Sequence, residues 1–431
     1  MKEQFILGVS KKNITPPLGT PLYGYPKFEN RKATSVHDDL HANVAVFGHG
    51  TPCAALISME LLALEENLTR EIASLISKET KIPAENIVIA SIHNHSGPCT
   101  KDTPGWGSQN RHYIDDILIT KTLEAVKEAV ANIQPALLGI GRTESLVGIN
   151  RRQISPSGTV TLGQNPYGCF DPEMTVLSFV TKEKKPILTI AHYGAHATSA
   201  GAGPEISRDW PGVMVDRLEA ESGAMAFFIN GAEGDVGPRL SNGRTTGDFS
   251  HTEEIGGLAA IDALRAYKSI KEYREVDFRV ITDTINIPYR PMPTREELVA
   301  KINELEGATA GMKLLRLATY KEQLALLDSK EELPDNFELL QTLFAFNSLV
   351  FVPFPFEVFS EITVRLKQYS PYQHTLSMSN TNGYYSYLPS HEQLSRGGYE
   401  VEQFNTNPRC LVENTDDIII NENLKLMDKI L

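Results

Sequence analysis

Long hydrophobic runs are missing from this sequence. No stretch approaches the roughly 18 unbroken apolar residues that a membrane helix needs. The short apolar segment near the N-terminus meets Lys11, Lys12 and Pro16 before it reaches the length of a signal-peptide core. We therefore expect no stable membrane insertion and a cytoplasmic location.

Cysteine is scarce, and basic residues are outnumbered by acidic ones. The four cysteines form no CxxC pair, and without a sign of secretion we expect them to be reduced thiols. Lys plus Arg number 41 against 54 Asp plus Glu, a formal net charge of -13. Such a balance disfavours an electrostatic grip on nucleic acid or on an anionic membrane. We expect a small-molecule substrate and no nucleic-acid partner, and a homo-oligomer is compatible with the sequence. The cysteines are Cys53, Cys99, Cys169 and Cys410.

The chain of 431 residues also lacks internal repeats and low-complexity linkers. Strand-like and helix-like segments alternate through its first 270 residues, beginning with a strand at Ala54–Met59, a helix at Glu65–Thr80 and a strand at Asn86–Ile92. This alternation predicts an α/β fold, with a mostly parallel or mixed sheet and helices on both faces.

The pattern changes after residue 275. Val276–Tyr289 alternates like a strand with one exposed face, and Thr294–Asp328 is typical of amphipathic helices interrupted near a pair of glycines. We predict one catalytic unit over residues 1–431, made of an α/β core (1–275), a strand with a helical insertion (276–335) and an α+β part (336–431).

The sharpest motif is HNHSGP at residues 93–98, directly after an apolar strand. Residues two apart on an extended chain share a face, so His93 and His95 can point into one cavity at the strand end. The alternative is a pair of polar residues that open a turn. A second pair, His192 and His196, also follows an apolar strand, but the Glu of an HExxH zinc motif is missing and Gly194 disfavours a helix. A packed histidine at a strand end is the alternative there.

Three further segments hold polar groups in unusual settings. The loop NGAEGDVGP (230–238) follows a strand but carries neither GK[ST] nor GxGxxG, so a tight structural turn competes with a nucleotide loop. Glu357 lies within FVPFPFEVF (351–359), where a buried carboxylate must be paired or bound to a metal unless it sits at a helix N-terminus. The aromatic-rich loop NGYYSY (382–387) is compatible with simple surface packing.

Taken in order, these motifs resemble the catalytic domain of the neutral, non-lysosomal ceramidases, zinc amidases that cleave the fatty-acyl amide of ceramide. The family's THTHSGP resembles IHNHSGP (92–98), its WFAxHPxS resembles HYGAHATS (192–199), and its SxDxxG is similar to SRDWPG (207–212). Its PGEF resembles PFEV (355–358), and its YxxY followed by YE resembles YYSY (384–387) with Tyr399 and the next glutamate. GVSKKNITP (8–16) and INR (149–151) fit as well.

The resemblance implies a metal site and a set of catalytic groups. It places one zinc ion per chain on His93, His196, Glu357 and Tyr387, and it selects His196 over His192. With that zinc we hypothesise a metal-bound water as the nucleophile, a group that carries the proton to the leaving atom and two donors that hold the oxyanion. These catalytic roles fall on His95, Arg151 and Tyr399, and the expected substrate pocket includes Asp209, Asp235 and Gly237.

Two departures from the family shape the functional expectation. The family's GDVSPN is GDVGPR (234–239) here, so Gly237 stands where the family has the serine implicated in amide cleavage. We also expect no secretory signal and no immunoglobulin-like C-terminal domain.

We therefore predict a zinc-dependent, ceramidase-like hydrolase that cleaves an amide or ester of a small acylated substrate. We do not expect a true ceramidase, because ceramide is a membrane lipid to which an acidic cytoplasmic protein has poor access. The alternatives are a catalytically inactive, metal-bound ligand-binding module and a zinc lyase or isomerase.

Overall fold

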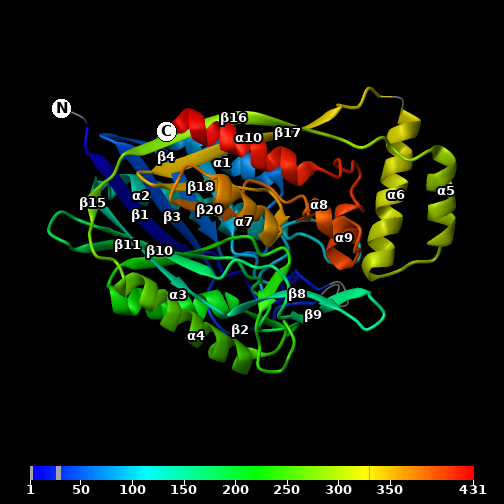
Figure 1. Cartoon of the computed structure of the whole chain (residues 1–431), viewed down its shortest axis with the longest axis horizontal. Coiled ribbons are helices and arrows are strands. Elements are labelled where there is room, and N and C mark those ends of the chain that lie inside the picture. Colours follow the sequence, from blue (N-terminus) through cyan, green and yellow to red (C-terminus); the bar gives the residue numbers. More distant parts are fainter. Residues whose placement is uncertain (1–2, 26–30, 330) are drawn as a thin grey trace.

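Two five-stranded sheets pack face to face between layers of helices (Figure 1). The computed structural model describes residues 3–25, 31–329 and 331–431. The first sheet has the order β5-β4-β3-β1-β6 and the second β13-β11-β10-β7-β15. The strands of the first sheet are β1 (Phe5–Asn13), β3 (His41–His49), β4 (Thr51–Met59), β5 (Ile87–Ser91) and β6 (Gln134–Pro135). Those of the second are β7 (Leu137–Glu144), β10 (Glu173–Val180), β11 (Pro186–Tyr193), β13 (Met225–Asn230) and β15 (Arg274–Glu275).

The strands of these sheets are buried on both sides because their alternating side chains enter two different cores. In β3, Val44 and Val46 face a cluster shared with the helices α1 (Glu66–Thr80) and α2 (Thr120–Ala131). Ala45 and Phe47 face the opposite way, into the core between the two sheets. The second sheet is covered in the same manner by α3 (Asp209–Ser222) and α4 (Phe249–Lys268). A π-helical segment, Tyr113–Ile119, leads directly into α2, and a 3-10 turn, Ala84–Asn86, precedes β5.

Both sheets are mixed, which confirms the α/β class but not a largely parallel pairing. Only β4–β5 and β11–β13 pair in parallel within them, and the other described pairs are antiparallel. For β3 and β4 the reason is the length of the connection: Gly50, with φ 69, alone separates them, and such a short link cannot make the crossover that a parallel pair needs.

The C-terminal part contributes a third sheet that joins the same core. It contains β16 (Phe278–Pro288), β17 (Asn336–Phe346), β18 (Leu349–Pro353) and β20 (His374–Met378). Phe346 and Phe351 from this sheet lie in one hydrophobic cluster with Phe5 and Phe47. The helices α7 (Ser360–Tyr369) and α10 (Thr415–Ile430) pack on its other side.

A helical hairpin interrupts this third sheet. It is formed by α5 (Arg295–Glu304) and α6 (Gly311–Ser329), lies between β16 and β17 in sequence, and projects to the right in Figure 1. The expected helical interruption near the glycines is thus present, at residues 305–310. The remaining short elements are β2 (Ser35–Val36), β8 (Gly148–Ile154), β9 (Val160–Asn165), β12 (Glu205–Ile206), β14 (Val236–Pro238), β19 (Glu357–Val358), β21 (Tyr387–Leu388), α8 (His391–Leu394) and α9 (Tyr399–Phe404).

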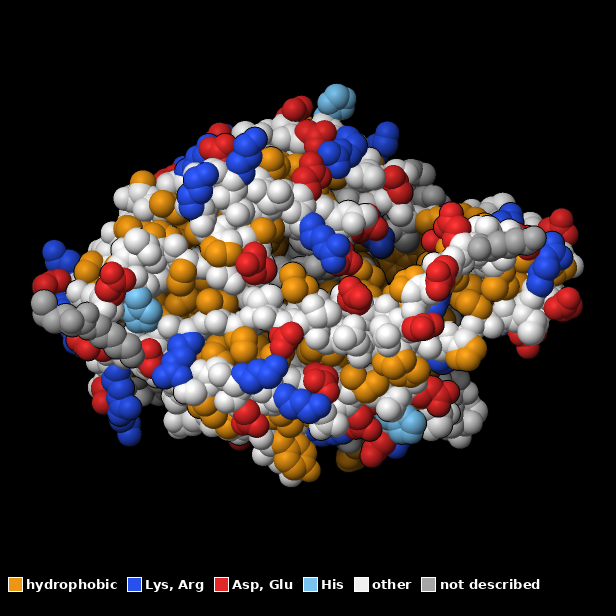
Figure 2. Space-filling view, turned by 90° about the horizontal axis from the view of Figure 1, so that it is seen from above, with side chains coloured by type: hydrophobic (Ala, Val, Ile, Leu, Met, Phe, Trp, Pro, Cys, Tyr) orange, Lys and Arg blue, Asp and Glu red, His pale blue; other side chains and the backbone are white. Residues whose placement is uncertain are grey.

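One face of the molecule mixes charges of both signs. On the face shown in Figure 2, Lys and Arg side chains lie among Asp and Glu side chains. Among the helices of the described residues, none combines the length and the apolar character required to cross a bilayer.

The inter-sheet core predicts a large cost for truncating its central aromatic residue. Phe47 is fully buried against the rings of Phe5, Phe179 and Phe346. We expect Phe47→Ala to lower the free energy of unfolding by about 3–5 kcal/mol in urea titrations, through lost burial and a residual cavity. The control Leu258→Ala, at a position 48% exposed on α4, should stay within about 0.5 kcal/mol of wild type. Equal midpoints for the two variants would contradict this description of the core.

Candidate functional site

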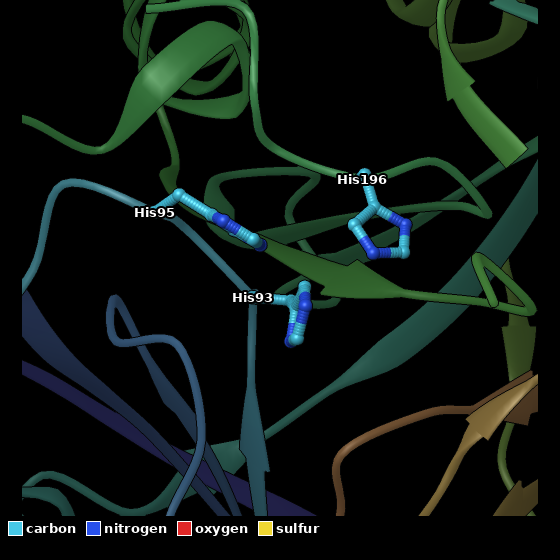
Figure 3. A group of neighbouring side chains, drawn as sticks. All are labelled: His93, His95 and His196. Carbon is cyan, nitrogen blue, oxygen red and sulfur yellow. The ribbon is translucent and has the colours of Figure 1, made fainter. Parts of the chain in front are cut away.

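Three histidine rings converge where β5 and β11 end. His93 and His95 follow β5, His196 follows β11, and the three side chains point toward a common space (Figure 3). The ring centroids of His93 and His196 lie 4.8 Å apart, and those of His93 and His95 lie 5.0 Å apart. One ring nitrogen from each residue lies within 4.8 Å of the other two. The sequence prediction of a histidine cluster at strand ends is therefore matched by the fold.

The local backbone differs from the one expected. The sequence predicted an extended chain with His93 and His95 on one face. In the structure His93 has φ 64, so the chain turns at that residue. Hydrogen bonds secure this unusual conformation, with the His93 amide donating to the Leu61 carbonyl at 3.0 Å. The rings converge because the chain turns, and not because two side chains alternate along a strand.

Main-chain carbonyls decide which nitrogen of each ring carries the proton. Every Nδ1 of the three histidines lies within hydrogen-bond distance of a carbonyl oxygen, which accepts only from a protonated nitrogen. Each Nε2 is therefore left with a free lone pair. Nε2 of His95 and of His196 makes no hydrogen bond within the described part of the chain. The Nδ1 contacts are His93 to Leu62 at 3.1 Å, His95 to Gly24 at 2.9 Å and His196 to Glu233 at 2.8 Å.

Burial keeps these rings uncharged. It lowers the pKa of His93, His95 and His196, and for His196, where the nearby charge of Arg151 adds to the effect, the pKa falls to about 3. A neutral imidazole with Nδ1 bonded to a carbonyl and Nε2 free is the form in which histidine binds a metal ion.

Glu357 completes the cluster from the C-terminal part of the chain. It lies in β19 and not at a helix N-terminus, is 0% exposed, and places Oε2 3.0 Å from Nε2 of His196 and 3.5 Å from Nε2 of His93. The pKa of Glu357 lies below its ordinary value although burial opposes ionisation, and the positive charge of the nearby Arg151 contributes to this. The hydroxyl of Tyr384 donates to its Oε1 at 2.7 Å.

A parallel pairing brings Tyr387 to the same place. β19 pairs with β21 so that Glu357 is opposite Tyr387, whose hydroxyl accepts a hydrogen bond from Nη2 of Arg151 at 2.9 Å. Arg151 in turn donates to Glu400 at 2.9 Å, and the ring of Tyr399 lies 5.7 Å from that of Tyr387. The residues that resemblance alone had suggested, Arg151, Tyr387 and Tyr399, are thus neighbours in the fold.

Glu233 is a functional candidate that the sequence analysis passed over. It is 0% exposed, and one of its carboxylate oxygens lies within 4.8 Å of ligand atoms of His93 and Glu357. Burial and the charge of Glu357 raise the pKa of Glu233 well above its ordinary value. The available signal was an acidic residue in a glycine-rich loop directly after a buried strand, but a tight turn explained that loop equally well.

The three predicted pocket residues have different surroundings. The carboxylate of Asp235 accepts a hydrogen bond from the Ser360 amide at 2.7 Å. The carboxylate of Asp209 accepts hydrogen bonds from the amide and hydroxyl of Ser199 and from the amides of Ala200 and Trp210. At Gly237, an added Cβ would lie 2.7 Å from Cβ of Thr245. A serine cannot occupy position 237 unless Thr245 moves. The assignment of these three residues to a substrate pocket stays a prediction.

Known proteins resemble this chain in sequence. The family described as "Neutral/alkaline non-lysosomal ceramidase, N-terminal" matches residues 5–254. The chain belongs to this family. The neutral ceramidase of Pseudomonas aeruginosa is 26% identical over an alignment of 226 residues that covers 48% of this chain and 33% of that protein. The matched segment therefore spans about a third of that ceramidase.

Solved ceramidase structures share the fold of this family member. The crystal structure of neutral ceramidase from Pseudomonas aeruginosa matches with a TM-score of 0.76 and 18% identity, covering 100% of this chain and 75% of that one. A ceramidase complexed with C2 matches with a TM-score of 0.75 and 18% identity, covering 99% of this chain and 76% of that one. The family resemblance and the mixed α/β fold predicted from the sequence are confirmed.

His192 provides a test that separates a structural from a ligating histidine. Its Nε2 lies 2.7 Å from the Ser377 carbonyl, and burial lowers its pKa from 6.5 to about 4. Because its pKa is lower in the folded state, neutral His192 contributes to the free energy of unfolding above pH 6.5. This contribution, about 3 kcal/mol in total, is lost as the pH falls toward 4. We expect His192→Gln to flatten the pH dependence of unfolding over this range while leaving metal binding unchanged. Identical pH profiles for wild type and variant would contradict this role.

Proposed function

We propose that this ceramidase-family protein is a zinc-dependent hydrolase that cleaves an amide or ester bond of a small acylated substrate. The observation that carries the proposal is the convergence of free imidazole lone pairs on a buried, ionised carboxylate. His93, His196 and Glu357 contribute only acceptor atoms to the space they share. Nitrogen and carboxylate donors of this kind suit Zn²⁺.

The residues present fit a bound zinc ion. His93, His196 and Glu357 would hold it, with Tyr387 as the fourth ligand that the family resemblance implies. Burial and Glu357 raise the pKa of the Tyr387 hydroxyl, while the charge of Arg151 acts in the opposite direction and favours the phenolate. When bound, such an ion supplies Lewis acidity, which polarises a carbonyl oxygen and makes water a better nucleophile at neutral pH.

The neighbouring side chains supply proton transfer and charge stabilisation. Nε2 of His95 has no partner among the described residues, so the neutral ring can accept a proton from an attacking water and pass it to the leaving group. Burial raises the pKa of Tyr399, which keeps its hydroxyl protonated and able to donate to a developing oxyanion. Arg151, held by Glu400, supplies a fixed positive charge beside it.

The surroundings of position 237 support a substrate other than ceramide. Gly237 stands where the family has serine, and the side chain of Thr245 occupies the space that a Cβ would need. A substrate pocket lined by position 237 would therefore differ in shape from one that presents a serine hydroxyl. We propose a small acylated amide or ester as the substrate.

Metal content is the first test of the proposal. We expect about one zinc per wild-type chain purified without a histidine tag, and none in His93→Ala/His196→Ala, because that variant lacks both imidazole ligands. The variant His192→Gln serves as the matched control and should keep the metal. A wild-type protein that takes up no divalent cation would overturn the proposal.

A substrate panel tests the reaction class. N-acyl amides, simple esters and lactones would be incubated with the zinc-loaded protein, and hydrolysis identified by the gain of one water in the product mass. We expect His95→Ala and Tyr399→Phe each to lower kcat by about 100-fold or more on any compound that is cleaved. The control Tyr369→Phe, at a site 63% exposed, should be unaffected. Full turnover by both variants would contradict the assigned roles, and binding without turnover would favour a ligand-binding module.

A further inference from the structure

Glu233 faces the histidine cluster from a loop that the fold holds rigidly. The loop follows β13, and its position against β19 is set by the Gly234 amide, which donates to the Val358 carbonyl at 2.8 Å. A Cβ at Gly234 would lie only 2.4 Å from the Glu357 carbonyl oxygen, so the two segments are in close contact. The carbonyl of Glu233 also accepts from Nδ1 of His196 at 2.8 Å. The backbone that orients His196 thus also carries the Glu233 side chain.

The carboxylate of Glu233 is only half satisfied by the protein. Its Oε1 accepts a hydrogen bond from Nδ2 of Asn380 at 2.6 Å, whereas its Oε2 is buried and has no hydrogen-bond partner among the described residues. An unsatisfied, fully buried carboxylate oxygen is costly, and a second carboxylate, that of Glu357, lies close by.

The ligand atoms close to the Glu233 carboxylate belong to His93 and Glu357. Together with Nε2 of His196, which contacts Glu357, they are acceptors as well. Nε2 of His93 and of His196 carry free lone pairs, and Oε2 of Glu357 also makes no hydrogen bond within the described chain. A single proton can be shared by at most two of these four atoms. One divalent cation can lie among the ligand atoms of His93, Glu233 and Glu357, which are within 4.8 Å of one another, and with neutral imidazoles the two carboxylates balance its charge.

We propose that Glu233 is a further ligand of the metal ion, so that two histidines and two carboxylates of this chain, and not one carboxylate, surround it. This inference rests on the metal site of the proposed function. It assigns a role in metal binding to Glu233, because this side chain takes no part in the proposed proton transfer or oxyanion stabilisation.

The test compares variants of Glu233 in metal titrations of the metal-free protein. Glu233→Gln keeps the shape of the side chain and the hydrogen bond from Asn380 but removes the charge, and Glu233→Asp keeps the charge on a shorter side chain. The control Asp416→Asn alters another carboxylate that is 1% exposed and is paired with Arg365 outside the cluster. Co²⁺ and Zn²⁺ affinities, the visible absorption of the Co²⁺ form and the melting temperature of each metal-free protein would be measured.

We expect Glu233→Gln to weaken Co²⁺ and Zn²⁺ binding by at least about tenfold and to change the Co²⁺ absorption, because a charged ligand is lost. Its metal-free form should melt no lower than wild type, since one of two facing carboxylates is neutralised. Glu233→Asp should bind more tightly than Glu233→Gln, and Asp416→Asn should match wild type.

Wild-type affinity and an unchanged Co²⁺ spectrum in Glu233→Gln would overturn the inference while leaving the metal site of the proposed function intact. Equal losses in Glu233→Gln and in the control Asp416→Asn would also overturn it, because the loss of any buried carboxylate, and not of a metal ligand, would then be responsible. If wild type itself binds neither ion, the proposed metal site fails, and this inference fails with it.

Discussion

The hydrogen bonds from three Nδ1 atoms to main-chain carbonyls are the interactions on which the site depends. They hold His93, His95 and His196 in one tautomer, and they leave each Nε2 lone pair free toward a common space. The carbonyls belong to segments far apart in sequence, so the tautomers follow from the tertiary structure. The close approach to His95 also requires Gly24, with φ +115, because a Cβ there would lie 2.6 Å from Nδ1.

The paired sheets explain why these segments meet. Each sheet is buried on both faces, so its strands end in loops that cannot shift without disturbing two cores. Asn230, at the end of β13, links the two histidine loops, because its Nδ2 donates to the Ile92 carbonyl at 2.9 Å and its Oδ1 accepts from the Ala195 amide at 3.2 Å. β18 and β20 of the third sheet share the inter-sheet core, and the short strands β19 and β21 that follow them along the chain bring Glu357 and Tyr387 together at the site.

A buried network of charged side chains lies beside the histidine cluster. The acceptor atoms lie at its centre, and Arg151 lies beside them, bonded to Tyr387 and to Glu400. Arg152 donates to the second oxygen of Glu400 at 2.8 Å, which completes a buried network. Such a network keeps Arg151 in one position in a low-dielectric setting, where its charge acts strongly on nearby groups.

Local patterning in the sequence was enough to predict several helices and strands, the α/β class and the placing of His93 at a strand end, because the 3.6 and 2.0 periodicities reflect burial that neighbouring residues share. The motifs also sufficed to identify the family, which the comparisons confirm. Only the tertiary structure decided that the sheets are mixed, that Glu357 lies opposite Tyr387 and that Glu233 enters the cluster. These features depend on which distant segments pack together, and that is set by shared cores and backbone pairing rather than by any short stretch of sequence.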